Sequence, residues 1–175
     1  GTTVTMPNGT IIDVRGGLCA GDVACGANGM AGNGTGTGTG DRITFTWQDP
    51  ANASATGSCA GIFNNNHYNR DPSCNEGILL RSTVDVGATK LNHVSITNAY
   101  GMPRWVSEIS EVRYGAIVAE GSSPTMTGLK FTGVNTTSLL ILDLGRPDII
   151  GGEFTVGDDE TSLVGSAIQA YGAGS

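Results

Sequence analysis

The sequence predicts an all-β fold, a solenoid with long loop excursions and little or no helix. Glycine supplies 28 of the 175 residues and charged residues only 14%, whereas an average protein holds about 7% glycine and about 25% charged residues. The motif LKFTGV at 129–134 returns as GEFTVG at 152–157, 23 residues later. Gly, Pro, Ser and Asn lie between such motifs, and no segment of helical period does. Short strands joined by tight turns fit all three observations.

Internal repetition is the observation that specifies the solenoid. The segment 116–134 aligns without a gap on 139–157, a third copy begins at 167–175, and a more distant copy spans 77–99. A period of about twenty residues made of strands and turns alone is typical of a solenoid. The frame of a leucine-rich repeat is absent, so we expect a parallel β-helix. Strands of successive coils would then lie about 4.8 Å apart.

The recurring pairs of Phe or Ile with Thr are explained by this stacking. Residues one repeat apart lie above one another, so the first member of each pair is expected to form an inward apolar column: Phe45, Ile96, Phe131 and Phe154. Burial of one such side chain contributes roughly 1.5–3 kcal/mol. The threonines that follow are expected to point the other way: Thr46, Thr97, Thr132 and Thr155. Gly128 and Gly151 recur at corners, where other residues resist the required backbone angles.

The whole chain, 1–175, is expected to form one β-helix domain with three loop excursions. Residues 3–14 predict two strands around a Pro-Asn-Gly turn. The glycine-rich stretch 16–40 has little capacity to form a core, so we expect a long excursion there. A second excursion is predicted at 48–76. A third, at 100–114, is expected to be a loop that could include a helical turn.

The order of these motifs resembles the right-handed parallel β-helix repeats of secreted and surface proteins of bacteria. The stretches that carry the resemblance are VTMPNGTIIDV, GDRITFTW, GILLRS, TKLNHVSITNA and GAIVAEGSSPTMTGLKFTGV. It covers most of the chain outside the excursions and implies the fold. It implies no single activity, because this fold carries lyases, hydrolases, phage depolymerases, adhesins and passenger domains.

Charge and hydropathy exclude two classes of partner. The net charge of −7 disfavours nucleic acid, whose phosphates require a basic face. No apolar run reaches the roughly 20 residues that a membrane-spanning helix needs. The chain begins at Gly1 without an initiating Met, which suggests a processed or excised product.

Cysteines and sequons favour an extracellular or cell-surface location. The cysteines fall as two local pairs without metal-ligand spacing, Cys19 with Cys25 and Cys59 with Cys74. We therefore expect two disulfides, which persist outside the cytoplasm. Four N-x-S/T sequons are candidate glycosylation sites: Asn8, Asn33, Asn52 and Asn135.

The candidate catalytic residues are Glu120, Asp143 and Arg146. Glu120 and Asp143 occupy equivalent positions of the two repeats in the gapless alignment. Stacked one coil apart, near 5 Å, two carboxylates could act as acid and nucleophile on a glycoside. Each also ends a strand at a corner, where a solvated acidic residue is common. Arg146 follows in the next turn and could complete a polysaccharide-binding face or form a surface ion pair.

Other polar groups give weaker signals. Asp158, Asp159 and Glu160 could bind Ca²⁺, but the spacings of known Ca²⁺ loops are missing, so an ordinary solvated turn is the favoured interpretation. No other cofactor is expected. His67 and His93 have no Ser, Asp or Cys partner at the spacing of a catalytic triad. Exposed aromatic residues in or beside the excursions could stack on sugars or cover the core: Trp47, Tyr68, Tyr100, Trp105 and Tyr114.

The predicted function is that of an extracellular structural or adhesive module. The last coil starts with AIQAYGAGS and has no amphipathic cap, and an uncapped solenoid exposes strand edges. Such ends could stack head to tail into a filament or dock on neighbouring domains of a longer chain. The alternative prediction is a carbohydrate-active enzyme, a polysaccharide lyase or glycoside hydrolase, with a polysaccharide as partner.

Overall fold

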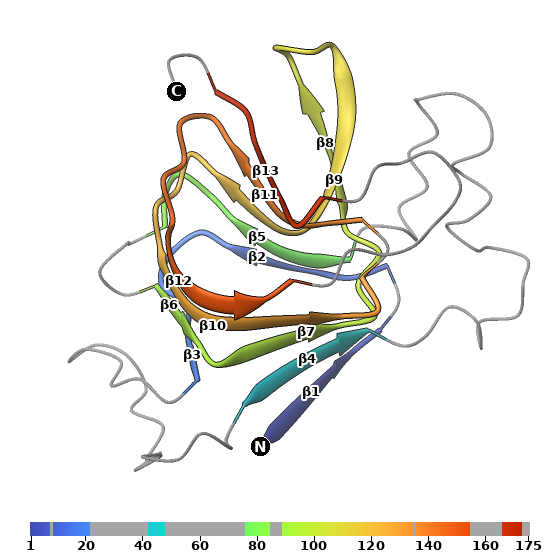
Figure 1. Cartoon of the computed structure of the whole chain (residues 1–175), viewed down its shortest axis with the longest axis vertical. Helices are drawn as coiled ribbons and strands as arrows, with labels where there is room; N and C mark the ends of the chain where they lie inside the picture. The colour runs from blue at the N-terminus through green and yellow to red at the C-terminus, as the bar shows by residue number, and fades with distance from the viewer. Residues whose placement is uncertain are drawn as a thin grey trace, which may run out of the picture.

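The computed structural model describes most of the repeat region. The residues it describes are 1–7, 9–21, 42–47, 76–84, 89–134, 136–154 and 166–172. Within them the chain forms two sheets and no helix (Figure 1). None of these residues therefore lies in a helix long and apolar enough to cross a membrane.

The first sheet joins strands from the whole length of the chain. Its members are β1 (Thr2–Met6), β3 (Cys19–Gly21), β4 (Ile43–Trp47), β6 (Lys90–Asn92), β7 (Val94–Thr97), β10 (Thr125–Thr132) and β12 (Asp148–Glu153). The order is β1-β4-β7-β10-β6-β3, with β12 also paired to β10. Every pairing in it is parallel.

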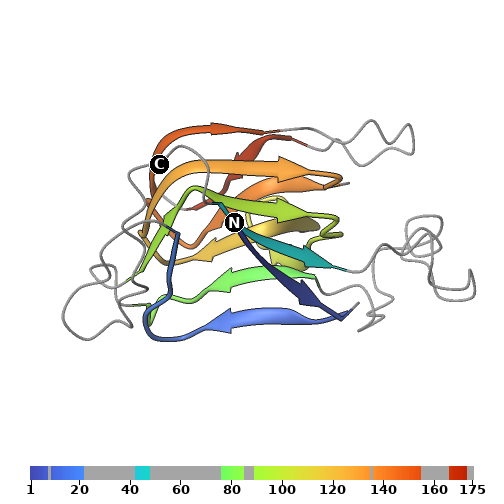
Figure 2. The ribbon, with the colours of Figure 1, turned by 90° about the horizontal axis from the view of Figure 1, so that it is seen from below.

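The second sheet lies opposite the first. Its members are β2 (Ile11–Val14), β5 (Gly77–Leu80), β8 (Met102–Val106), β9 (Glu111–Glu120), β11 (Thr137–Leu142) and β13 (Ile168–Ala170). The order is β13-β11-β9-β5-β2, again parallel, and β8 pairs antiparallel with β9. Strands β2, β5, β9, β11 and β13 thus follow one another in space as they do along the chain. Figure 2 shows this as layers that pass from blue to red.

The chain passes from one sheet to the other and back. Within the first sheet strand β10 bends, and its residues 125–127 pair with β6 while residues 130–132 pair with β7. Gly128 lies between these two halves with a φ of 57°. A Cβ atom there would also approach the His93 ring at 2.6 Å. Glycine is therefore required at this bend, as the sequence predicted.

Parallel register stacks apolar residues into three columns. The first is Val4, Phe45, Ile96 and Phe131, with Phe154 stacked on Phe131 at a centroid distance of 5.2 Å. The second is Ile12, Ile78, Ile117, Leu139 and Ile168. The third is Ala20, Leu91, Met126 and Ile149. All but Val4 and Ile168 contribute to one core between the sheets. The predicted Phe/Ile column is confirmed, and Thr46, Thr97 and Thr132 form the adjacent column.

Two of the predicted excursions differ from the structure. Cys19–Gly21, inside the first excursion, is strand β3 and pairs with β6. The stretch 100–114 leaves the sheets, but it is a β-hairpin of β8 and β9 with a turn at 107–110, and the expected helical turn is wrong. Antiparallel pairing satisfies its backbone groups without a helix. The remainder of the first excursion and most of 48–76 lie outside the described residues.

Candidate functional site

The face of the second sheet that points away from the core carries its own apolar cluster. Six buried side chains form it: Leu79, Met102, Val106, Val118, Leu140 and Leu142. Met102 and Val106 come from β8, so the hairpin covers part of this face. Tyr171, just beyond β13, packs against the same cluster. The side chains of this sheet are therefore buried on both faces, as in parallel sheets generally.

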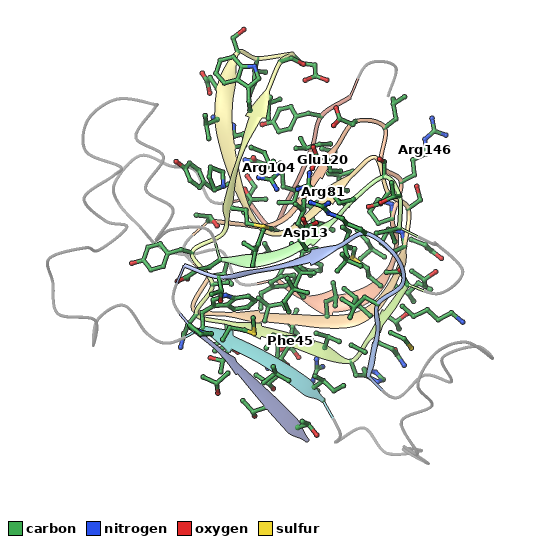
Figure 3. The ribbon with its side chains drawn as sticks, turned by 180° about the vertical axis from the view of Figure 1, so that it is seen from behind. Asp13, Phe45, Arg81, Arg104, Glu120 and Arg146 are labelled. Carbon is green, nitrogen blue, oxygen red and sulfur yellow. The ribbon has the colours of Figure 1, made fainter. Side chains whose placement is uncertain are left out.

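Charged side chains converge beside this apolar cluster. Asp13 lies on β2 and Arg15 directly follows that strand. Arg81 follows β5, Arg104 lies on β8, and Glu120 ends β9. We call these five residues the arginine–carboxylate cluster. Figure 3 shows Asp13, Arg81, Glu120 and Arg104 side by side along the outside of the sheet, below the hairpin. Residues up to 107 positions apart in sequence, from 13 to 120, meet because β2, β5 and β9 are neighbouring strands.

Asp13 is the acceptor for two arginines. Arg81 donates Nε–H to Oδ1 at 3.0 Å and Nη2–H to Oδ2 at 3.4 Å. Arg15 donates Nε–H and Nη2–H to Oδ2 at 3.2 and 3.1 Å. The hydrogen bond from Arg81 is the largest cause that holds the pKa of Asp13 below its ordinary value. The same bond raises the pKa of Arg81, so both groups are charged near neutral pH.

Glu120 is shared loosely between two guanidinium groups. Its Oε2 accepts from Arg81 Nη1 at 3.4 Å and lies 3.6 Å from Arg104 Nε. Both distances exceed the roughly 2.7–2.9 Å of a strong charge-assisted hydrogen bond. Arg104 Nε is buried and makes no hydrogen bond to any described residue. Burial lowers the pKa of Arg104, and the charge of Glu120 opposes that shift.

Arg113 extends the positive charge along the hairpin. It is the cross-strand partner of Arg104, so the two guanidinium groups leave the hairpin on the same face. Arg113 donates Nε–H to the hydroxyl of Tyr171 at 3.2 Å and forms an ion pair with Glu111. A hydroxyl and a carboxylate thus offset the charge that β8 and β9 bring together.

The arrangement favours recognition of an anion. Three guanidinium groups face two carboxylates in the arginine–carboxylate cluster, a local excess of one positive charge in a chain of net charge −7. Guanidinium groups match the geometry of carboxylate and sulfate oxygens. Among the described residues no group of three His, Cys, Asp or Glu side chains could hold a metal ion.

The predicted pairing of Glu120 with Asp143 is wrong. The register places Leu142 beside Glu120, one residue earlier than the gapless alignment required. Asp143 lies past the end of β11, in a turn where its φ is 52°. The register shifts because the turn 143–147 is one residue longer than the turn 121–124. Asp143 is thus displaced by one residue from the position directly beside Glu120 that a stacked carboxylate pair requires.

Arg146 is separate from the arginine–carboxylate cluster. Its backbone N–H donates to Ser123 Oγ at 3.0 Å. Its exposed side chain projects from the edge of the molecule in Figure 3. Arg146 thus lies apart from Glu120, and the polysaccharide-binding face expected around it stays a prediction.

Several predicted site residues lie outside the described residues. These are Cys25, Cys59 and Cys74, the sequons at Asn8, Asn33, Asn52 and Asn135, and the Ca²⁺ candidates Asp158, Asp159 and Glu160. Cys19 is described and is disulfide-bonded. Its pairing with Cys25 stays a prediction.

The aromatic side chains divide into buried and exposed. Trp47 is 1% exposed and donates Nε1–H to the Thr10 carbonyl at 2.7 Å, so it belongs to the core. Trp105 on the hairpin is 51% exposed and is available to a ligand or partner.

Sequence reasoning missed the arginine–carboxylate cluster, although part of its signal was present. Arg81 follows GILL and Glu120 follows AIVA, and the register Leu80 opposite Ala119 makes these two positions equivalent. Aligning these two repeats would have found an Arg–Glu pair. Arg104 carries no such signal, because it reaches Glu120 from a hairpin outside the repeat.

Comparison of the chain with protein-family models, curated proteins and solved structures finds no significant match.

Proposed function

We propose that the chain is an extracellular structural or adhesive module, a right-handed parallel β-helix that stacks head to tail on further copies of itself. The proposal has two parts, the winding of the chain and the chemistry of its two ends.

The winding is supported by the order of the strand pairings. Each strand of the second sheet from β2 to β11 has strands of the first sheet before and after it in the chain. The chain adds β3 and β4 to the first sheet between β2 and β5, and β6 and β7 between β5 and the hairpin. Equivalent residues of these parallel strands extend the same three apolar columns. Parallel strands joined by crossovers wind right-handed in nearly all proteins, which gives the hand of the coil.

The single observation that carries the stacking is the exposure of the columns at their ends. Ile117 and Leu139 in the middle of the second column are fully buried, whereas Ile168 at its end is 41% exposed. The first column ends on Val4, which is 36% exposed. Strands β1, β2 and β13 are edge strands among the described residues. Unpaired edges of this kind template further pairing.

A second copy fits these ends because the stacked strands β2, β5, β9, β11 and β13 all run in one direction. The β13 end of one copy and the β2 end of the next would continue the parallel ladder and place Ile168 beside Ile12. Each aliphatic side chain buried in this way contributes roughly 1.5–3 kcal/mol. The two surfaces differ, so the contact is heterologous and repeats without closing into a filament.

Sedimentation velocity and electron microscopy of the oxidised protein test the proposal. We expect fibres or a concentration-dependent series of oligomers. Ile168→Lys and Val4→Lys put a charge into an end contact and should give a monomer. Ile109→Lys is the matched control, because Ile109 is equally exposed at 36% but lies in the hairpin turn. A monomer at every concentration, or equal loss of assembly in the control, would contradict stacking and leave the ends to neighbouring parts of a longer chain.

An extracellular location is supported by the disulfide at Cys19. Mass measurement of the protein purified from its native source, before and after reduction, tests it. Reduction of two disulfides should raise the mass by about four units, two for each bond. Attached glycans would appear as a much larger excess over the mass of the amino-acid sequence. Free thiols throughout would contradict the assignment. The alternative of a polysaccharide lyase or glycoside hydrolase stays a prediction, and the register between β9 and β11 gives no support to its candidate pair Glu120 and Asp143.

A further inference from the structure

We propose that the arginine–carboxylate cluster is a binding site for a short acidic saccharide, whose carboxylate or sulfate group contacts Arg81 and Arg104. This goes beyond the proposed stacking and does not depend on it, because Arg81 and Arg104, which contact the ligand, are not carried by the end strands β1, β2 and β13, although Asp13 belongs to β2.

Unused hydrogen-bond donors are the first observation. A guanidinium group carries five N–H donors. Arg81 uses three with described residues, two to Asp13 and one to Glu120, and Arg104 uses one, to the Pro103 carbonyl. Six donors of the two groups therefore have no acceptor among the described residues. One of the six, Arg104 Nε, is buried, and a buried donor without a partner is rare in native proteins and calls for an explanation.

The second observation is that Glu120 is shared at long distance between two guanidinium groups. One carboxylate oxygen spans 3.4 Å to Arg81 and 3.6 Å to Arg104. An oxyanion that binds the exposed edge of Arg81 would release Glu120 to approach the buried Nε of Arg104. Both guanidinium groups would then have close partners, so the bound state gains an ion pair that the free protein makes only at long distance.

Accessibility is the third observation. The side chains of Arg104, Glu120 and Arg81 are 22%, 29% and 36% exposed, which leaves the cluster open to a ligand while it rests on the sheet. Asp13 fixes Arg81 through two hydrogen bonds, so little side-chain entropy is lost when a ligand binds. Partial burial also makes each charge contact stronger than at a fully solvated surface.

The charge of the whole chain sets the size of the ligand. A net charge of −7 repels a long polyanion, whereas the local excess of positive charge attracts one acidic group. The apolar cluster beside the charged residues is itself buried, but Tyr171 packs against it and is only partly buried, so its ring offers a surface on which a sugar ring stacks. These features favour a short acidic saccharide over an extended acidic polymer.

Titration calorimetry at low salt with three matched probes tests the proposal. The probes are a trigalacturonate, its methyl ester, which is neutral, and a sulfated disaccharide. We expect one or both acidic probes to bind and the ester not to bind. A response to only one of them identifies carboxylate or sulfate as the group recognised, and binding should weaken as salt is added.

Substitutions at two positions, Arg104 and Arg146, locate the site. Arg104→Gln should weaken binding of the acidic probe at least tenfold, and Arg104→Lys, which keeps the charge but loses the planar fork, should weaken it less. Arg146→Gln removes the same charge from an exposed position and should leave binding unchanged. Thermal unfolding of each variant checks that the fold is intact, and the sulfated or carboxylated probe should raise the midpoint of the native protein.

Four results would overturn the proposal. They are equal binding of the methyl ester, equal weakening by Arg146→Gln, no binding of either acidic saccharide at about 10 mM, and binding of inorganic sulfate alone. The last would show an anion site with no affinity for a saccharide. None of these results bears on stacking, which is measured separately with the end variants.

Discussion

Replacing Phe131 with alanine tests the stacked register on which the fold depends. Phe131 is fully buried, pairs with Ile96 on β7 and stacks on Phe154 with ring centroids 5.2 Å apart. Thr132, the next residue of the same strand, is exposed. Because side chains alternate across a strand, a register displaced by one residue would exchange the environments of these two positions.

The expected cost follows from what the ring contacts. Truncation of a buried Phe to Ala costs about 3–5 kcal/mol, part of it for the cavity that remains. About 0.5–1.5 kcal/mol of this loss would be the aromatic pair with Phe154. For a chain of this length each kcal/mol lowers the unfolding midpoint by about 2–4 °C, so we expect a fall of roughly 6–20 °C. Thr132→Ala should change stability by less than about 0.5 kcal/mol.

The assay is chemical and thermal unfolding followed by circular dichroism, with disulfides intact. A double-mutant cycle of Phe131→Leu and Phe154→Leu isolates the pair energy, since leucine leaves a smaller cavity than alanine. Equal destabilisation by Phe131→Ala and Thr132→Ala would refute the register. A coupling of zero between Phe131 and Phe154 would refute their stacking while leaving the register in place.

Three further predictions concern single positions. Gly77→Ala should destabilise the fold strongly, because Gly77 has a φ of 136° and an added Cβ would overlap a backbone carbonyl of β9. Gly16→Ala is the control and should be nearly neutral, because the space around Gly16 is open. Urea unfolding compares the two variants. Burial raises the pKa of Glu76, so the folded state holds the proton of this carboxyl more tightly than the unfolded state does. The stability that the proton contributes is therefore lost as pH rises from the ordinary pKa of Glu through the raised pKa. Glu76→Gln should flatten that part of the curve of stability against pH. A slope unchanged in the variant would remove Glu76 as its source. Trp47→Phe removes the hydrogen bond to Thr10 and should lower the free energy of unfolding by about 0.5–1.5 kcal/mol. Because Trp47 is buried, the variant should lose the blue-shifted part of the tryptophan fluorescence. Loss of the red-shifted part instead would mean that Trp47 is exposed.

The column of Phe45, Ile96 and Phe131 could be predicted from sequence because each strand alternates clearly between apolar and polar residues. That alternation fixes which face is buried and so fixes the register. Gly128 and Gly151 were predictable for the same reason, and both have positive φ, 57° and 64°. These positions depend on local sequence patterns that recur in each repeat, so aligning the repeats reveals them.

The hairpin and the arginine–carboxylate cluster could not be predicted in the same way. The hairpin occurs once, so no second copy reveals its pattern, and its glycine-poor sequence gave no turn signal strong enough to define two strands. Arg104 meets Glu120 only because the hairpin returns over the second sheet. A contact between a unique element and a repeated one depends on tertiary packing, which periodicity does not contain.

The error at Asp143 has a physical cause that also explains how this fold tolerates change. The run Leu139–Leu142 is apolar at every position because both faces of the second sheet are buried. Such a strand satisfies the core in either register, so its sequence alone cannot report a shift of one residue. The extra residue was absorbed in the turn 143–147, which lies at the surface. Insertions in these turns should therefore move polar residues such as Asp143 relative to Glu120 while the buried ladder stays intact. On this reasoning the polar residues at the turns that follow β9 and β11 can be rearranged by turn length alone, and the length of each turn decides which side chains meet there.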